Sequence, residues 1–485
     1  MSSLLSVGID VGTSTTQVVF SRLLLRDRAA RFTAPDIRIT AAEAFYRGKI
    51  YETPLLDNVR IDAKALRALV EGEFRRAGIS PGETDTGAVI ITGESARKEN
   101  AAAVLERLSS LAGDFVVATA GPDLESRIAG QGSGAQEESR RRRCRVANFD
   151  IGGGTTNIAI FDAGNLAGVG CYDIGGRLLR FTPEGALTYI SPGAAQIARS
   201  LGLRFRAGEK PAADELSQLA DMFARVLESA VNPEILSPFA AMLRTPNSSP
   251  LTPIPVDAVC FSGGVADCVY GARHGRFEFH DFGVILAQAV RGGGLFGYPV
   301  ITPKETIRAT VIGAGNYTTT LSGSTIRYTD GALFPIKNLP VFLLSPAQEE
   351  AAFSGTPCDL ARPLRAFMQQ ADAAQVAIAL IGKPSPGWQE LQRMARALAD
   401  AFFAAMAGTP LVILTRHDMG KALGQALLGV RGQGSGIRDA GIGDLIVLDG
   451  ITAGEYQFID IGRPVMGGCA VPVVMKTLVF PNAQL

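Results

Sequence analysis

The strongest constraint on the fold of this chain is a short pattern that occurs twice. Near the N-terminus an apolar run leads to Asp10, then Gly12, then the hydroxyl residues Thr13 to Thr16, and then a second apolar run. Residues 144–162 repeat this order with Asp150, three glycines and two threonines. Each copy predicts a β-hairpin with a polar tip, because turn residues stand between two apolar strands. Two hairpins built alike predict an internally duplicated α/β fold.

The residue types at both predicted tips suit the phosphates of a nucleotide. Glycine lets the backbone come close to a ligand, and hydroxyls beside exposed N–H groups supply donors for phosphate oxygens. A carboxylate before each tip suits a divalent cation that offsets the phosphate charge. One such hairpin alone is as readily an ordinary turn, and the second copy favours the binding interpretation. The predicted phosphate-binding residues are Gly12, Thr13, Ser14, Thr15, Gly152, Gly153, Gly154, Thr155 and Thr156, with Asp10 and Asp150 as catalytic residues and metal ligands.

Two later segments contain glycines where a ligand or a second element would come close. The segment "DAVCFSGGVAD" (257–267) is an apolar strand that ends in a glycine pair, which suits close approach to a base or a ribose. The segment "TIRATVIGAGNYT" (306–318) has glycines among small apolar residues, which favours tight packing of two elements. The residues predicted to border the nucleotide in these segments are Ser262, Gly263, Gly264, Gly313 and Gly315.

In this order the four segments resemble the motifs of the actin-like ATPase superfamily, which includes actin, DnaK-type chaperones, sugar kinases and bacterial division proteins. The resemblance covers roughly the first two-thirds of the chain. It implies two α/β domains around a cleft for ATP and Mg²⁺, and a first connecting helix in "PDLESRIAG". Chaperone-type members have an acid just before that proline, where this chain has Gly121. Asp123 or Glu125 is therefore the candidate that positions the hydrolytic water.

A second resemblance extends along most of the chain. The stretches "GIDVGTSTTQVVFSRL", "ITAAEAFYRGKIYETPLL", "VIITGESARKENA" and "FIDIGRPVMGGCAVPVVMKTLVFP" are similar to the ethanolamine ammonia-lyase reactivating factors of ethanolamine utilization. That family implies a chaperone-like ATPase that binds ATP or ADP and acts on ethanolamine ammonia-lyase, where damaged cobalamin is exchanged for intact adenosylcobalamin on the partner. A filament or cell-division scaffold and a small-molecule kinase of the same fold are the alternatives.

Composition disfavours several other classes of protein. The chain has 47 basic and 47 acidic residues, so no overall field recruits nucleic acid or an acidic membrane. Six scattered cysteines and three histidines disfavour a zinc site or disulfides and favour a reducing cytoplasm. The resemblance to the ethanolamine utilization family, and not the composition, adds association with a bacterial microcompartment as an expectation. The start "MSSLLSVGID" predicts a core strand and no signal peptide. The window "ALADAFFAAMAGTPLVILT" is interrupted by Asp400 and Gly-Thr-Pro, which predicts a buried helix and strand and no membrane insertion.

The length of 485 residues favours about three domains. The predicted limits are 1–146 and 147–330 for the two actin-like domains and 331–485 for a C-terminal α/β region that we assign to partner recognition. In this region His417 and Asp418 follow a predicted strand, where ligands often bind in open α/β sheets, although a loop-capping pair is the preferred explanation. Two further predictions are a solvated surface loop at "GQGSGAQEESRRRRCR" and a core helix at "ADELSQLADMFARVLESAVNP".

Overall fold

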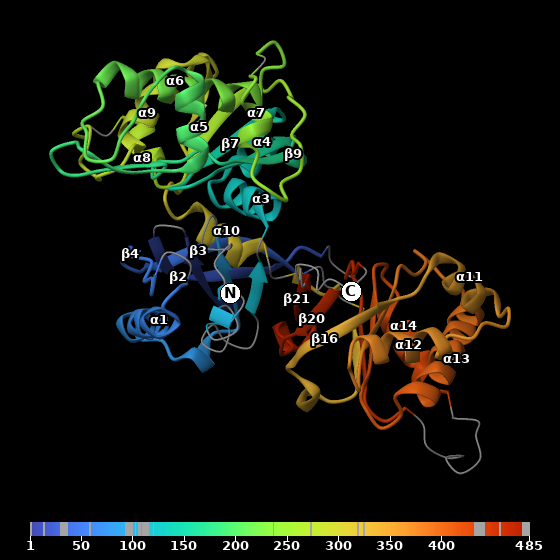
Figure 1. The fold of residues 1–485 in the computed structure, drawn as a ribbon. Helices are drawn as coiled ribbons and strands as arrows, with labels where there is room; N and C mark the ends of the chain where they lie inside the picture. Colours follow the sequence, from blue (N-terminus) through green and yellow to red (C-terminus); the bar gives the residue numbers. More distant parts are fainter. Residues whose placement is uncertain are drawn as a thin grey trace.

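The computed structural model of the chain forms three lobes, each built on one main β-sheet (Figure 1). The residues that it describes are 2–12, 15–29, 37–57, 60–92, 100–101, 103–104, 108, 116–119, 121–235, 237–271, 274–317, 320–323, 325–430, 442–454 and 457–477.

The first lobe contains a sheet with the strand order β3-β2-β1-β5-β6. Strands β1 (Ser2–Val11), β2 (Thr15–Asp27) and β3 (Ile37–Arg47) are antiparallel, whereas β5 (Thr86–Ile91) and β6 (Val116–Thr119) run parallel to β1. The short strand β4 (Tyr51–Glu52) pairs with β2, and helix α1 (Ala63–Ala77) packs its apolar face on the sheet. The predicted N-terminal core strand is therefore confirmed.

The second lobe repeats this topology in the order β9-β8-β7-β12-β13. Strands β7 (Arg145–Ile151), β8 (Thr156–Asp162) and β9 (Asn165–Tyr172) are antiparallel, and β12 (Ala258–Ser262) and β13 (Val300–Ile301) continue the sheet in parallel. The repetition confirms both the predicted duplication and the actin-like fold.

Helices complete the core of the second lobe. Helix α6 (Ala213–Ser229) buries its apolar face in this core together with α9 (Gly283–Gly292), which confirms the predicted core helix. The other elements of this lobe are β10 (Leu179–Phe181), β11 (Leu187–Ile190), α5 (Pro192–Ser200), α7 (Ala240–Leu243), α8 (Ala266–Val269) and the 3₁₀ turn η3 (Gly294–Gly297).

Two helices lie between the first and second lobes, α3 (Pro122–Gly132) and α10 (Ala309–Tyr317) (Figure 1). They cross at glycines. A Cβ atom at Gly132 would lie 1.8 Å from the carbonyl oxygen of Ala309, and one at Gly313 would lie 2.0 Å from that of Ile128. The tight packing predicted for the 306–318 segment is thereby confirmed. Helix α10 packs on β1, β2 and β5, whereas α3 packs on β7, β8 and β9, so each helix lies on the sheet of the other predicted domain.

The surface loop predicted for residues 130–145 is wrong. This stretch contains the end of α3 and a further helix, α4 (Ala135–Arg142). Glu138 forms ion pairs with Arg141 and Arg142, one turn away on the same helix, and these pairs stabilise a helix that composition alone disfavours. The arginines themselves are exposed, as expected.

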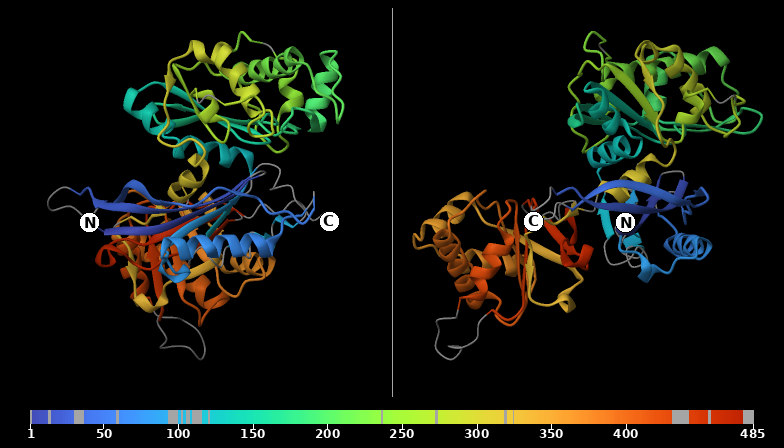
Figure 2. Two further views of the ribbon diagram at one scale, coloured as in Figure 1. Left: turned by 90° about the vertical axis from the view of Figure 1, so that its left-hand side faces the viewer. Right: turned by 180° about the vertical axis from the view of Figure 1, so that it is seen from behind.

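The third lobe contains an eight-stranded sheet in the order β14-β21-β20-β16-β17-β18-β19-β15. Its four central strands, β16 (Ile336–Leu343), β17 (Ala377–Leu380), β18 (Leu411–Thr415) and β19 (Leu445–Leu448), are parallel. The strands that flank these four are β20 (Gln457–Ile461) and β21 (Pro472–Thr477), and the edge strands are β14 (Thr320–Leu321) and β15 (Arg327–Tyr328). This lobe adjoins the first lobe, where β21 lies against β6, and extends away from the second (Figure 2).

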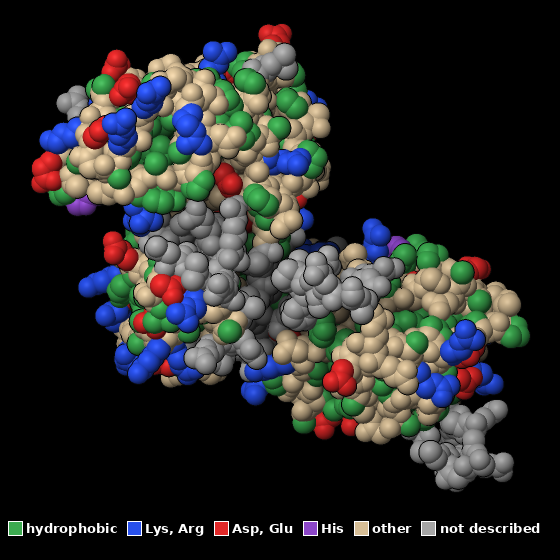
Figure 3. Space-filling model, viewed as in Figure 1, with side chains coloured by type: hydrophobic (Ala, Val, Ile, Leu, Met, Phe, Trp, Pro, Cys, Tyr) green, Lys and Arg blue, Asp and Glu red, His purple; other side chains and the backbone are tan. Residues whose placement is uncertain are grey.

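Four helices cover one face of the third sheet, and they share a single apolar core with it. They are α11 (Pro346–Ser354), α12 (Ala361–Gln370), α13 (Trp388–Ala405) and α14 (Gly420–Leu428). The most apolar window of the sequence forms the buried side of α13 and the buried strand β18, as predicted. In the described part of the chain, no helix combines the length and the apolar character that a membrane span requires. Acidic and basic side chains are interspersed on the face that Figure 3 shows.

Candidate functional site

The two hairpins are closed by the same backbone contacts. In the first, Val11 pairs with Thr16 and the Gly12 N–H donates to the Thr15 carbonyl oxygen at 2.9 Å. In the second, Ile151 pairs with Thr156 and the corresponding bond, Gly152 to Thr155, is also 2.9 Å. The duplicated pattern therefore closes both hairpins with the same strand pair and the same Gly–Thr hydrogen bond. Thr13 and Ser14 lie outside the described residues, so their phosphate contacts stay predictions.

Asp10 is almost fully buried at the end of β1. Its Oδ1 atom accepts a hydrogen bond of 3.0 Å from the Thr92 hydroxyl, which follows the neighbouring strand β5. Burial raises the pKa of Asp10 to about 7; the bond from Thr92 opposes this rise, and the negative charge of Asp150 adds to it. The action of the Asp150 charge on Asp10 indicates that the two carboxylates lie near each other.

Asp150 occupies the equivalent position in the second lobe and receives two hydroxyl donors. Ser262 donates to its Oδ1 atom at 2.5 Å and Thr310 to its Oδ2 atom at 3.3 Å. Burial raises the pKa of Asp150 to about 6, and both donors oppose the rise. Thr310 lies on α10, so the second connecting helix touches the carboxylate directly. Sequence reasoning missed this role, although Thr310 lies within the segment that it singled out.

The two carboxylates fit a magnesium ion that arrives with a nucleotide. Magnesium usually binds proteins through one or two carboxylates and completes its shell with phosphate oxygens and waters. Within the described residues, no three His, Cys, Asp or Glu side chains come together as a complete protein cage. Two neighbouring buried carboxylates repel each other, and a cation bound to both would offset this repulsion and the cost of burial.

The segment predicted to contact adenosine has three distinct environments. The Ser262 hydroxyl is fully buried and bonded to Asp150, so it orients the carboxylate. Gly263 has a φ of +88°, and a Cβ atom there would lie 2.4 Å from the Ile151 carbonyl oxygen, so only glycine fits against the hairpin. Gly264 is exposed, and a Cβ atom there would have no atom within 4 Å. Of the three residues, Gly264 has space for a ligand beside it.

The tip of the second hairpin is supported by a segment that sequence reasoning missed. The Gly152 and Gly153 carbonyl oxygens accept from the N–H groups of Gly176, at 2.9 Å, and Arg177, at 2.6 Å. The glycine pair at 175 and 176 could have indicated this close approach of two backbone segments. A Cβ atom at Gly175 would lie 2.5 Å from the Gly153 carbonyl oxygen.

Arg177 adds a positive charge close to this tip. Burial lowers its pKa, while Asp281 of the same lobe and Glu52 of the first lobe act in the opposite direction. The side chain of Arg177 pairs with Asp281 at 3.8 Å, and its backbone N–H group bonds to the second hairpin tip. The charge of Glu52 also acts on it, and Glu52 belongs to β4, which pairs with the first residues of β2. A half-buried arginine in this position could balance phosphate charge.

The threonines of the second hairpin are buried. Thr156 donates its hydroxyl to the Ile174 carbonyl oxygen at 2.7 Å, which ties the hairpin to the supporting segment. Thr155 is almost fully buried beside it. Gly154 is buried as well, while Gly152 and Gly153 are partly exposed. The phosphate contacts predicted for these residues stay predictions, as does a nucleotide contact of Gly313 or Gly315 in α10.

The two candidates for positioning water differ in their surroundings. Asp123 accepts from both the N–H group and the hydroxyl of Ser249, at 3.0 and 2.5 Å, and so anchors a loop of the second lobe. Glu125 lines a small cavity together with Thr92, the residue that donates to Asp10. The arrangement therefore favours Glu125.

Known proteins match the chain along its whole length. The family model for "Ethanolamine utilisation protein EutA" matches residues 2–481. Two curated relatives named "Ethanolamine ammonia-lyase reactivase EutA" are similar, one from Salmonella typhimurium strain LT2 at 40% identity and one from Escherichia coli strain K12 at 38%, each over 99% of both chains.

Solved structures show much weaker likenesses. The Aquifex aeolicus PPX-GPPA enzyme matches 64% of this chain and 99% of its own with a TM-score of 0.40 and 14% identity. The ethanolamine utilization protein EutJ from Carboxydothermus hydrogenoformans matches 65% and 89% with a TM-score of 0.31 and 16% identity. Scores this low support no inference.

Proposed function

The chain belongs to the EutA family of ethanolamine utilisation proteins, and from this membership we propose that it reactivates ethanolamine ammonia-lyase. In this proposal the protein is a chaperone-like ATPase that opens a lyase stalled with damaged cobalamin, so that intact adenosylcobalamin takes its place. ATP and Mg²⁺ are the cofactors, and cobalamin is handled on the partner. The proposal implies a cytoplasmic protein, and association with a microcompartment stays a prediction.

The observation that carries the ATPase part of the proposal is the pair of equivalent hairpins with a buried aspartate on each. Asp10 and Asp150 would hold the cation from opposite lobes, and the cation would offset the phosphate charge. Backbone N–H groups at the two tips would bind the phosphate oxygens, and Arg177 would add a positive charge beside them. Glu125 would orient the attacking water, since phosphoryl transfer depends mainly on positioning and charge stabilisation.

The connecting helices supply a route from the nucleotide to the lobes. Thr310 of α10 bonds to Asp150, and the same helix crosses α3 at Gly132 and Gly313. A change at the phosphates would therefore be passed through Thr310 to the crossing of α3 and α10. The two helices are packed too tightly at this crossing to slide past each other. We infer a hinge motion in which loss of the γ-phosphate releases one lobe from the other.

The energies required are within reach of such a switch. A cofactor bound at nanomolar strength is held by about 12 kcal/mol, so its release is slow unless an open state of the lyase is populated. Moving a two-state equilibrium from 1:99 to 99:1 needs about 5.5 kcal/mol of differential binding. Nucleotide-dependent binding of this protein to the open lyase could supply that difference.

The test is an assay in which components are omitted in turn. Ethanolamine ammonia-lyase inactivated with a damaged cobalamin should regain activity when this protein, ATP, Mg²⁺ and adenosylcobalamin are all present. Omission of any one should leave the lyase inactive. No recovery from the complete mixture would contradict the proposal. In that case, phosphorylation of a polyol would point to a kinase, and polymers that sediment with ATP would point to a filament.

A further inference from the structure

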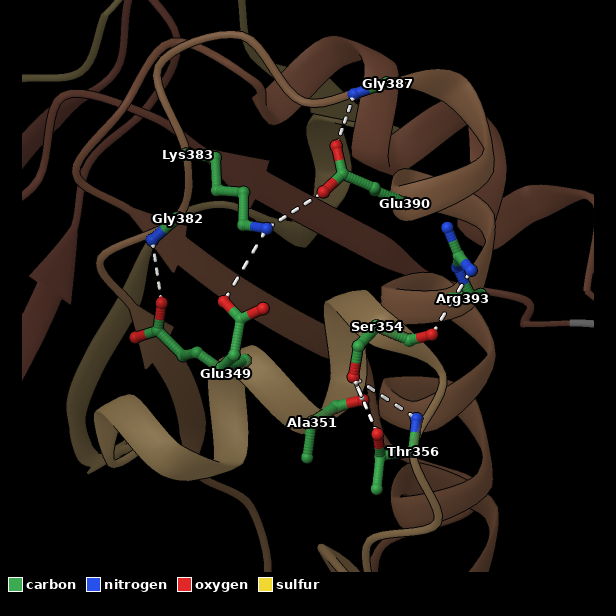
Figure 4. Close-up of polar contacts among 10 residues, drawn as sticks. Glu349, Ala351, Ser354, Thr356, Gly382, Lys383, Gly387, Glu390 and Arg393 are labelled. Atoms are coloured by element: carbon green, nitrogen blue, oxygen red, sulfur yellow. Dashed lines mark hydrogen bonds and ion pairs between the residues drawn. The ribbon is translucent and has the colours of Figure 1, made fainter.

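The carboxyl ends of the parallel strands in the third lobe meet at one edge of the sheet, and the end of β17 is already closed there. The N–H groups of Ile381 and Gly382 donate to the two carboxylate oxygens of Glu349, at 2.7 and 3.0 Å. Lys383 pairs with Glu390 at 2.8 Å on α13 (Figure 4). The polar groups at this part of the edge therefore bind each other, and no ligand is needed to satisfy them.

The ends of β18 and β19 are different, because two carboxylates meet there. Asp418 follows β18 and Asp449 follows β19. The Thr325 hydroxyl is in hydrogen-bond contact with Asp418 Oδ1 and with Asp449 Oδ2, and the Thr325 N–H group donates to the same Asp449 oxygen at 3.2 Å. A hydroxyl has one proton and cannot donate to both carboxylates. The cluster thus contains more acceptors than protons.

A separate feature of Asp449 points to a ligand. Its side chain is 1% exposed, and its Oδ1 atom has no hydrogen-bond partner among the residues that the structure describes. This oxygen faces the space beside Gly323, where a Cβ atom would lie 2.3 Å from it. A buried carboxylate oxygen without a partner is costly, so a further positive group is expected beside it.

We propose that Asp418, Asp449 and Thr325 form a second divalent-cation site, distinct from the cleft between the first two lobes. All three side chains offer oxygen, which is the donor that hard cations such as Mg²⁺ and Ca²⁺ take. Asp418 is exposed, so its side of the site is open to water molecules that complete the shell. Two carboxylates joined through one hydroxyl leave negative charge for such a cation to offset.

The experiment counts bound manganese, a probe for both cations, by electron paramagnetic resonance. The protein is the full chain without nucleotide, above neutral pH, with Asp10→Asn and Asp150→Asn so that the cleft does not contribute. We expect one bound Mn²⁺ per chain in this background. Adding Asp449→Asn, or separately Asp418→Asn, should weaken Mn²⁺ binding at least about tenfold.

Asp444→Asn is the matched control, since Asp444 is an exposed carboxylate just before β19, and it should leave Mn²⁺ binding unchanged. Asp418 is exposed as well, so its variant should fold, and melting curves in chelator verify this. No bound Mn²⁺ in the cleft-deficient background would overturn the proposal and leave a proton shared by the two carboxylates as the explanation. Mn²⁺ binding by the Asp418 and Asp449 variants that is as tight as in the cleft-deficient background would overturn it too.

Discussion

At the scale of single residues, the candidate cleft keeps two carboxylates in an unfavourable environment. The pKa of Asp10 rises from 3.8 to about 7 and that of Asp150 from 3.8 to about 6, mainly because both are buried. The folded protein thus holds these protons more tightly than the unfolded chain does. The stability they contribute is fully present below a pH of about 4 and is lost as the pH rises through 6 to 7. Such a cost at a site is typical of functional residues.

The first prediction follows from this loss of stability with rising pH. Without nucleotide and metal, Asp10→Asn should raise the free energy of unfolding above neutral pH, on the order of 1 kcal/mol or more, because a neutral amide replaces a buried charge. The same variant should lose ATP turnover. Urea titrations below and above the pKa of Asp10 provide the measurement, and the stability of the variant should change less between them. A variant that is less stable than the wild type above neutral pH, yet hydrolyses ATP normally, would refute the assignment of Asp10.

The second prediction concerns the adenosine segment. Gly264→Val places a side chain where no protein atom lies within 4 Å, so the fold should tolerate it. Nucleotide affinity should nevertheless fall at least about tenfold, or 1.4 kcal/mol, if the base or ribose lies there. Calorimetric titration gives the affinity. Gly292→Val is the control, since Gly292 in "RGGGLFG" has equally open surroundings at the end of α9. The nucleotide affinity of this variant should equal that of the wild type. If Gly264→Val binds nucleotide as tightly as Gly292→Val does, Gly264 does not border the nucleotide.

A third prediction separates the two acids of α3. Glu125→Gln should lower the rate of ATP hydrolysis about a hundredfold or more while nucleotide still binds, because the group that orients the water is lost. Asp123→Asn should leave the rate close to that of the wild type, since Asp123 anchors Ser249. Single-turnover hydrolysis is the measurement. The reverse ranking of the two variants would assign the role to Asp123.

At the scale of elements, the crossing of α3 and α10 is the contact most sensitive to volume. Gly132→Ala adds one methyl group at a point 1.8 Å from the Ala309 oxygen. We expect the free energy of unfolding to fall by about 1–3 kcal/mol, which is typical of an overpacked contact. Gly121→Ala, at the N-cap of the same helix, is the control, because nothing lies within 4 Å of its Cβ position. Denaturant titration should separate the two, and equal stabilities would mean that the helices can move apart freely.

The elements differ in how far the sequence could predict them. The hairpins were predictable, because strand alternation and glycine-rich turns are local signals, and the registers at Asp10 and Asp150 follow from them. Helix α4 was mispredicted, since ion pairs one turn apart do not stand out in a run of charges. The roles of Ser262 and Thr310 were not predictable, because they depend on which strand and which helix the fold brings to Asp150.

At the scale of the whole molecule, the third lobe adjoins the first, where β21 lies against β6, and extends away from the second (Figure 2). A hinge between the first two lobes would therefore move the third lobe as one body with the first, through the contact of β21 with β6. This geometry agrees with the partner-recognition role that we propose for residues 331–485. It would let a nucleotide-driven motion at the cleft act on a bound lyase.

The central claim is that nucleotide turnover in the cleft drives cobalamin exchange on the lyase. The most direct test measures how much damaged corrinoid remains with the lyase after gel filtration, following incubation with this protein, Mg²⁺ and ATP. The account predicts that the corrinoid elutes free of the lyase with the wild-type protein and stays bound with Asp10→Asn. Release to the same extent with both proteins, or release that does not require ATP, would contradict it.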